Sequence, residues 1–71
     1  MSGLKKRSFA IAGHRTSVAL EPEFWAILET SARALHKSLA GLIAEIDTAR
    51  GDRPLASALR LYALDAVRGK S

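Results

Sequence analysis

The sequence predicts a mainly α-helical protein with one short strand per chain, whose core is completed by a second copy. Three features predict this: an alternating stretch at residues 15–20, three amphipathic stretches after it, and a length of 71 residues without cysteine. At this size a single core rarely supplies more than about 3–5 kcal/mol of stability. Neither a disulfide nor a thiolate metal site is available to add to it. We therefore expect a homodimer or a higher even-numbered oligomer.

Residues 15–20 have the period-two pattern of a half-buried strand. The more apolar face carries Thr16, Val18 and Leu20, and the opposite face carries Arg15, Ser17 and Ala19. These more apolar residues have even numbers. Upstream, the large apolar residues Phe9 and Ile11 have odd numbers, so the apolar positions switch from odd to even near Gly13. We expect a turn or bulge there, because glycine tolerates positive φ angles.

The first two helices are predicted from their caps and apolar spacing. A helix from Glu21 to about His36 has Pro22 at a favourable first position and apolar residues three and four apart. A second helix begins after the N-cap Ser38 and ends at Arg50, with Gly51 just beyond. Gly41 within it costs about 1 kcal/mol relative to alanine, or else marks the close approach of another helix.

A third helix is expected after the break at residues 52–54. Its main apolar stripe is widened by Leu61 and Leu64. A helix that is apolar over so much of its circumference should be covered on more than one side, which again favours a dimer. The tail from Gly69 is expected to be loose.

The net charge of +4 is concentrated near the amino end, where the first twenty residues contain Lys5, Lys6, Arg7 and Arg15 but no acid. Such a segment suits nucleic acid, an anionic membrane or an acidic partner, or serves only solubility. The apolar stretches are too short to span a membrane, and the start has no signal-peptide pattern, so we expect a soluble cytoplasmic protein. His14 and His36 are too far apart to suggest a metal site, and no nucleophile or phosphate-loop motif is present. We expect neither an enzyme nor a cofactor.

The strand Arg15-Thr16-Ser17-Val18-Ala19-Leu20, the helix opening at Glu21-Pro22 and the cap at Ser38 together resemble the ribbon-helix-helix family of Arc and MetJ type. The runs Lys5-Lys6-Arg7-Ser8 and Ile11-Ala12-Gly13-His14-Arg15-Thr16-Ser17 are also similar to a bacterial subfamily with an extra C-terminal helix. On this basis residues 14–50 form the ribbon-helix-helix core. Residues 1–13 form a basic arm or an extra strand, and residues 51–71 a C-terminal helix and tail.

The resemblance implies a sequence-specific DNA-binding transcription regulator, a repressor in particular. Two intertwined chains would form an antiparallel intermolecular ribbon that enters the major groove. The expected base contacts are Arg15, Ser17 and Ala19, and the expected phosphate contacts are Lys5, Lys6, Arg7, Ser38, Leu39 and Ala40. The dimer core would contain Val18, Leu20, Trp25, Leu28, Leu42, Ile43, Ile46, Leu59 and Tyr62.

Simpler alternatives remain open for several of these residues. Arg15 could guard an edge strand, the basic run could serve solubility, and Trp25 and Tyr62 pack in an apolar stripe more readily than they stack on a base. The third helix could instead capture a protein partner, as the flexible ends of antitoxins do. A basic amphipathic surface lying on a membrane is a weaker option.

Overall fold

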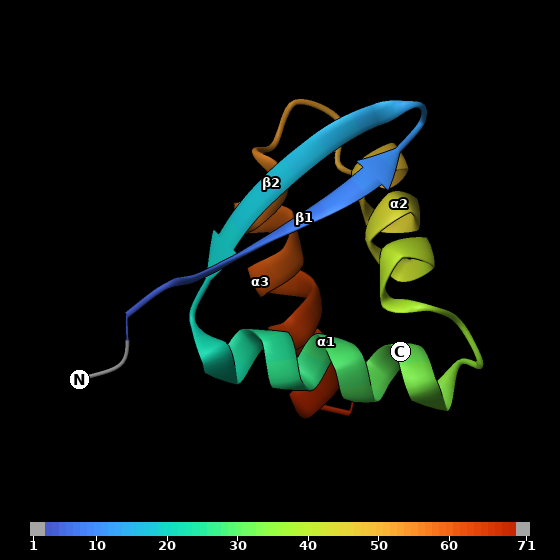
Figure 1. Ribbon diagram of the computed structural model, residues 1–71. Coiled ribbons are helices and arrows are strands. Elements are labelled where there is room, and N and C mark those ends of the chain that lie inside the picture. Colours follow the sequence, from blue (N-terminus) through green and yellow to red (C-terminus); the bar gives the residue numbers. More distant parts are fainter. Residues whose placement is uncertain (1–2, 70–71) are drawn as a thin grey trace.

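The structure, a computed structural model, describes residues 3–69 and consists of a β-hairpin followed by three helices (Figure 1). Residues 1–2 of the expected arm and residues 70–71 of the expected tail lie outside the described part. The elements in chain order are β1 (Lys5–Ile11), β2 (His14–Leu20), α1 (Pro22–Ala34), α2 (Leu39–Ala49) and α3 (Leu55–Val67). The mainly helical class and the third helix are confirmed. The expectation of one strand per chain is wrong, because β1 is a second strand.

The two strands pair antiparallel within one chain, with Lys5 opposite Leu20 and Ile11 opposite His14. The turn between them consists of Ala12 and Gly13, whose φ angles are 53° and 80°. Two central residues with positive φ form the turn type that matches the twist of a two-residue hairpin. The turn explains why the apolar positions switch from odd to even numbers near Gly13. It brings the apolar side chains of both strands to the same face of the hairpin.

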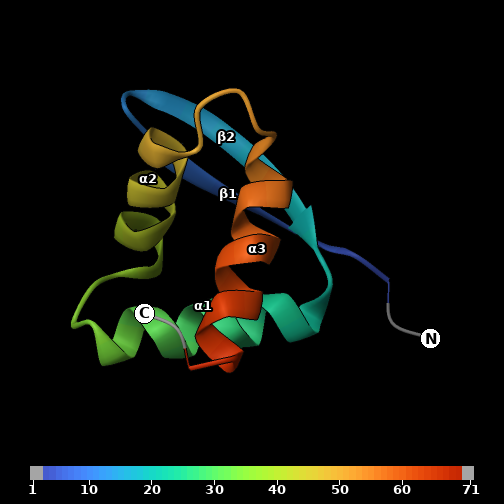
Figure 2. The same ribbon diagram turned by 180° about the vertical axis from the view of Figure 1, so that it is seen from behind.

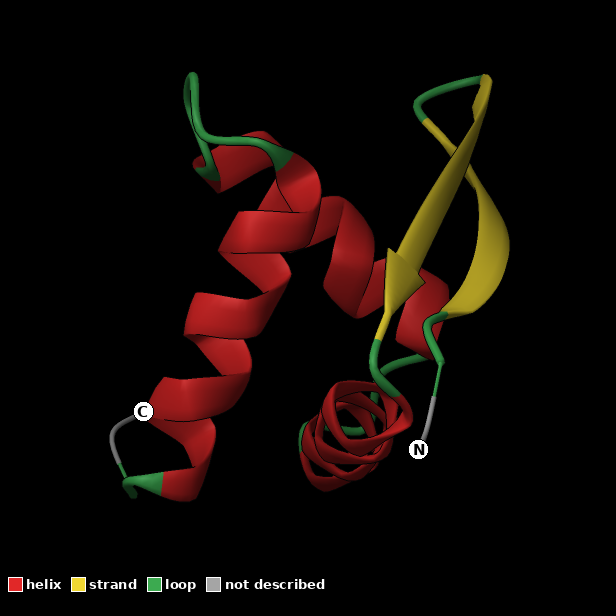
Figure 3. Cartoon of the chain, turned by 90° about the vertical axis from the view of Figure 1, so that its left-hand side faces the viewer, coloured by secondary structure: helices red, strands yellow, loops and turns green. Residues whose placement is uncertain are grey.

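The apolar face of the hairpin packs on the helices. Figure 3 shows the hairpin on one side of the molecule and the helices on the other. Val18 is 5% exposed and Leu20 is fully buried, and both join a core that also contains Ile11 and Trp25. The predicted facing of the strand is confirmed, since Arg15 and Ser17 on the opposite face are exposed.

The first helix ends at Ala34, two residues before the predicted end. His36 has a φ of 59°, which is the left-handed conformation and cannot continue a helix. The amide of Lys37 donates to the carbonyl of Ala32 at 2.9 Å, and the amide of His36 donates to that of Arg33 at 3.1 Å. These two bonds form the Schellman motif, here with histidine at the position where glycine is usual.

The cap of the second helix explains its internal glycine. The Ser38 hydroxyl oxygen accepts a hydrogen bond from the amide of Gly41 at 2.9 Å. A Cβ atom added at Gly41 would lie 3.1 Å from that oxygen, and no other helix lies within 4 Å of it. The close approach expected at Gly41 is therefore made by the cap serine and not by a neighbouring helix.

The third helix extends from the hairpin to α1, as the view from behind shows (Figure 2). Its residues Leu59 and Ala63 are fully buried in the core of the single chain. Leu61 and Leu64 remain 42% and 39% exposed. Within residues 3–69, α3 is thus covered on one side only.

The residues expected in a dimer core are already packed within one chain. The buried ones are Val18, Leu20, Trp25, Leu28, Leu42, Ile43 and Leu59. Ile46 and Tyr62 are partly buried against them. Their place between two chains stays a prediction.

Candidate nucleic-acid interface

The exposed side of the hairpin carries six side chains from two strands, which we call the outer face. Because directly opposite residues of an antiparallel pair point to the same side, the register defines its members. Three cross-strand pairs form it: Lys6 with Ala19, Ser8 with Ser17, and Ala10 with Arg15. The predicted base contacts Arg15, Ser17 and Ala19 therefore lie together on one face, and β1 adds three neighbours to them.

The chemistry of the outer face is polar and cationic. At the centre of the outer face, the hydroxyl oxygens of Ser8 and Ser17 lie 2.8 Å apart and are joined by a hydrogen bond. Lys6 and Arg15 are exposed and form no ion pair with any residue of the described chain. No acid belongs to this face, so both cations are available to an anionic ligand.

The other basic residues of β1 are positioned differently. Arg7 donates to a carboxylate oxygen of Glu29 at 2.7 Å, and its guanidinium lies 5.2 Å from the ring centroid of Trp25. Lys5 and Arg7 also face away from the outer face, because their cross-strand partners are Leu20 and Val18. Residues 1–13 were expected to form a basic arm or an extra strand, and the structure shows the strand from Lys5 to Ile11, which pairs with β2.

The predicted phosphate site at Ser38, Leu39 and Ala40 lies at the start of α2, on a different element from the outer face. Figure 1 shows α2 with its start toward α1 and its end toward the hairpin turn. The Ser38 hydroxyl serves the amide of Gly41. The amides of Leu39 and Ala40 belong to the first turn, which has no intrahelical acceptors for its N–H groups.

The junction of β2 and α1 is fixed by an ion pair. A carboxylate oxygen of Glu21 lies 3.0 Å from Nε of Arg60 on α3. The pKa of Glu21 is lowered from its ordinary value of 4.5 by a hydrogen bond from its own backbone N–H and by the hydrogen bond and charge of Arg60. This pair attaches the end of the ribbon strand to the C-terminal helix.

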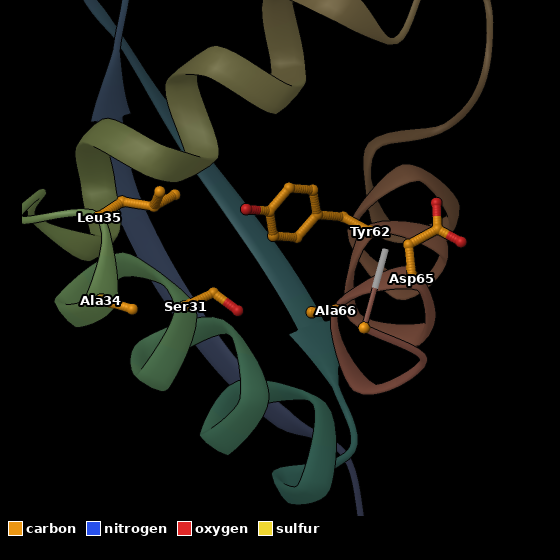
Figure 4. Close-up of a pocket in the computed structure, with 7 residues that line it drawn as sticks. Ser31, Ala34, Leu35, Tyr62, Asp65 and Ala66 are labelled. Carbon is orange, nitrogen blue, oxygen red and sulfur yellow. The ribbon is translucent and has the colours of Figure 1, made fainter. Parts of the chain in front are cut away.

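A cleft separates the C-terminal halves of α1 and α3, on a different part of the surface from the outer face (Figure 4). Its volume is about 590 Å³, and the residues lining it are Ser31, Ala34, Leu35, Tyr62, Asp65, Ala66 and Gly69. Leu35 is 48% exposed at its edge. The lining is mostly apolar, which suits another protein surface better than a nucleic acid.

Sequence reasoning missed half of the outer face. Lys6 was expected to contact phosphate only, and Ser8 and Ala10 were assigned no role. The missed feature is an internal repeat: Lys6-Arg7-Ser8-Phe9-Ala10-Ile11 and Arg15-Thr16-Ser17-Val18-Ala19-Leu20 share the pattern of a basic residue, any residue, serine, apolar, alanine, apolar.

Comparison with known proteins gives one match. The model of the ribbon-helix-helix domain family matches residues 4–67. No curated protein and no solved structure matches the chain. Among residues 3–69, no group of three acidic, histidine or cysteine side chains could hold a metal ion, and none of the helices is long and apolar enough to cross a membrane.

Proposed function

Because the chain belongs to the ribbon-helix-helix family, whose members are DNA-binding regulators that bind as dimers, we propose that it is a sequence-specific transcriptional repressor. The outer face of its hairpin enters the major groove. The observation that carries this proposal is the geometry of that face: two exposed cations, which form no ion pair within residues 3–69, and two serine hydroxyls lie on an antiparallel two-stranded ribbon. A ribbon of this kind fits the major groove.

The proposed base contacts follow from the side chains that the face presents. Arg15 can donate two hydrogen bonds to O6 and N7 of guanine, which discriminates against other bases by about 1–3 kcal/mol. Ser17 can donate or accept, and Ala19 can contact a thymine methyl group. All three are held in line because β2 is paired along its whole length with β1.

Phosphate contacts are assigned to the start of β1 and to the start of α2. Lys5 is exposed at the start of β1, on the side of the strand away from the outer face, and the amides of Leu39 and Ala40, with the Ser38 cap, lie at the positive end of the α2 dipole. Arg7 reaches a phosphate only by leaving Glu29. Contacts of this kind orient a protein on the duplex and carry no sequence information.

The proposed dimer places a second chain against the cleft between α1 and α3. Apart from the cleft, the exposed residues Leu61 and Leu64 give α3 an uncovered apolar side. Light scattering should give the mass of a dimer for the wild type and of a monomer for Leu35→Lys. Leu4→Lys, the same change at an exposed leucine before β1, is the control and should remain dimeric. A wild-type monomer at micromolar concentration contradicts this arrangement.

The alternative role as an antitoxin-like adaptor depends on a free C-terminal helix. In the structure Leu59 and Ala63 of α3 are fully buried against the rest of the chain. Since α3 is a part of the core, no specific observation favours its capture by a protein partner.

The DNA-binding proposal is tested by fluorescence anisotropy with duplexes selected from a random pool. The logarithm of Kd should rise linearly with the logarithm of the salt concentration, because binding releases counterions. Arg15→Ala should raise the Kd for the selected duplex until it is close to the Kd for an unrelated duplex. Arg33→Ala removes the same charge from α1 and should leave the ratio of the two affinities unchanged. No binding at low salt, or an unchanged ratio for Arg15→Ala, contradicts the proposal.

A further inference from the structure

We propose that two hairpins join through β2 into a four-stranded sheet, in which the two copies of β1 are the outer strands and Lys6 of each binds the DNA backbone beside the major groove. The inference rests on the proposed function and deepens it. It assigns the base contacts to β2, which enters the groove, and a separate phosphate contact to β1.

The free edge of β2 is where a second chain can add a strand. β1 occupies one edge of β2, and no strand pairs with the other edge within residues 3–69. The far edge of β1 is equally without a partner strand in this part of the chain, but β1 opens with three consecutive cations, whereas β2 has Arg15 as its only lysine or arginine. Charged side chains, lysine in particular, protect a strand edge from pairing. The intermolecular ribbon expected from the sequence therefore forms between two copies of β2, and the strand order is β1-β2-β2-β1.

The pairing of the two β2 strands has one register that keeps the apolar side chains inward along the whole strand. The buried residues Val18 and Leu20 have even numbers. Because directly opposite residues point to the same side, an even-numbered residue must lie opposite an even-numbered one. Among the pairings that satisfy this condition, the one centred on Ser17 pairs all seven residues of β2. It places Ser17 opposite its own copy, and Arg15 opposite Ala19 of the second chain.

The two registers together define the outer face of the sheet. Within each hairpin Lys6 lies opposite Ala19. Ala19 in turn lies opposite Arg15 of the second chain, so Lys6 and that arginine occupy the same row, two strands apart. At about 4.8 Å per strand, their backbones are separated by about 10 Å. The sheet therefore presents, at each end, one arginine in a central strand and one lysine in an outer strand, with serines across the middle.

The width of the major groove separates the roles of the two strands. Four strands span about 14 Å between the outermost backbones, because neighbouring strands lie about 4.8 Å apart. The major groove is about 12 Å wide and accommodates a two-stranded ribbon. The central pair of β2 strands therefore enters the groove, and the two β1 strands lie over its walls, which are the phosphate backbones. Lys6 is then placed beside phosphate, and Arg15 beside base edges.

The chemistry of Lys6 suits this place. Its side chain is exposed and forms no ion pair within residues 3–69. Lys5 and Arg7 point to the other side of β1, and Arg7 is bound to Glu29. The repeated pattern of the two strands differs in its basic residue, which is lysine at position 6 and arginine at position 15. Arginine binds guanine through two parallel hydrogen bonds, whereas the ammonium group of lysine is a point charge that binds phosphate without that geometry.

The sheet is tested by cross-linking of single-cysteine variants, since the chain contains no cysteine. Ser17→Cys places a thiol beside its own copy, and Ser8→Cys places one in each outer strand, about 14 Å apart. The variants are matched, because both lose the same hydrogen bond between these serines. With a short thiol-specific cross-linker, Ser17→Cys should give a covalent dimer on a denaturing gel, and Ser8→Cys should give a monomer. No dimer from Ser17→Cys, or an equal yield from Ser8→Cys, overturns the inference.

The phosphate contact is tested by the salt dependence of binding to the selected duplex. A dimer that loses two phosphate contacts should have a slope of log Kd against log salt that is smaller by about two. Lys6→Ala should show this reduction and still select the same sequence as the wild type, because phosphate contacts carry no sequence information. Arg68→Ala is the control, since it removes an exposed cation just after α3, and it should leave the slope unchanged.

The outcomes separate this inference from the proposed function. If Lys6→Ala has the wild-type slope, or if it changes the selected sequence, β1 is not a phosphate-binding strand and the inference is wrong. The proposed function stands in that case if Arg15→Ala still reduces the sequence preference. If the wild type selects no sequence, the proposed function itself fails, and the phosphate contact fails with it. Circular dichroism spectra matching the wild type establish that each variant is folded.

Discussion

The indole Nε1 of Trp25 donates a hydrogen bond to the backbone carbonyl of Lys5 at 2.8 Å. Trp25 is 4% exposed, and its ring also packs against Phe9, with the ring centroids 5.9 Å apart. A single side chain of α1 therefore holds the start and the middle of β1 on the helices. The bond is made on the inner side of the hairpin, so it fixes the ribbon and leaves the outer face open.

Trp25→Phe should lower the free energy of unfolding by about 1–2 kcal/mol. The substitution keeps an aromatic ring in the core but leaves the Lys5 carbonyl without its donor. Urea denaturation followed by circular dichroism measures the change. Tyr62→Phe, which removes a hydroxyl at the cleft, is the control and should change the value little. Equal changes in the free energy of unfolding for the two substitutions would show that the hydrogen bond to Lys5 does not stabilise the fold.

Ala12→Asn should raise the free energy of unfolding by about 0.5–1 kcal/mol. Ala12 has a φ of 53°, a conformation that asparagine adopts more readily than alanine, and Asn-Gly is a preferred pair for this hairpin turn. Thermal unfolding tests this. A decrease in stability would contradict the intramolecular hairpin, because the gain depends on this tight turn between β1 and β2.

Acidification should weaken the fold through Glu21. Since the pKa of this carboxyl is lowered in the folded state, its stabilising contribution is present above its ordinary value of 4.5 and is lost as the pH falls through the lowered folded value. Glu21→Gln should therefore be less stable than the wild type at neutral pH, and the two should converge in acid. Glu23→Gln, which removes a carboxylate of the same helical turn that forms no ion pair within residues 3–69, is the control. Urea midpoints measured from neutral pH to about pH 3 decide this.

Ser38→Ala should cost about 1 kcal/mol of stability, because the amide of Gly41 loses its side-chain acceptor at the start of α2. Thr48→Ala is a suitable control, since the Thr48 hydroxyl donates to a carbonyl within the same helix and caps nothing. Chemical denaturation should show a clear loss for the first variant and almost none for the second. A loss confined to Thr48→Ala would contradict the cap.

The elements with strong local patterns were predicted well from the sequence. Alternation placed Arg15 and Ser17 outward, and capping rules placed Ser38 at the start of α2, because both features depend on neighbouring residues only. The end of α1 was misplaced, since histidine at position 36 gives no local indication of a left-handed residue. That conformation is instead fixed by the two hydrogen bonds of the Schellman motif.

The second strand illustrates what local reasoning leaves open, because residues 1–13 were expected to form either a basic arm or an extra strand. Residues 5–11 alternate weakly, and the first four side chains are all charged or polar. Their strand is stabilised by pairing with β2 and by Trp25, twenty residues from Lys5 in sequence. Both depend on the turn at Ala12 and Gly13 having the geometry of a tight hairpin, which the sequence indicated only as a turn or bulge.

The contact between the outer face and the major groove is tested most directly by NMR of the complex with a selected duplex. In a chain with labelled alanine methyl groups, Ala19 should show intermolecular NOEs to thymine methyl protons or to cytosine H5 protons, which line the major groove. The methyl groups of Ala58 and Ala63, buried in α3, should show none. NOEs from the helices, or from minor-groove protons, with none from Ala19, would contradict the account.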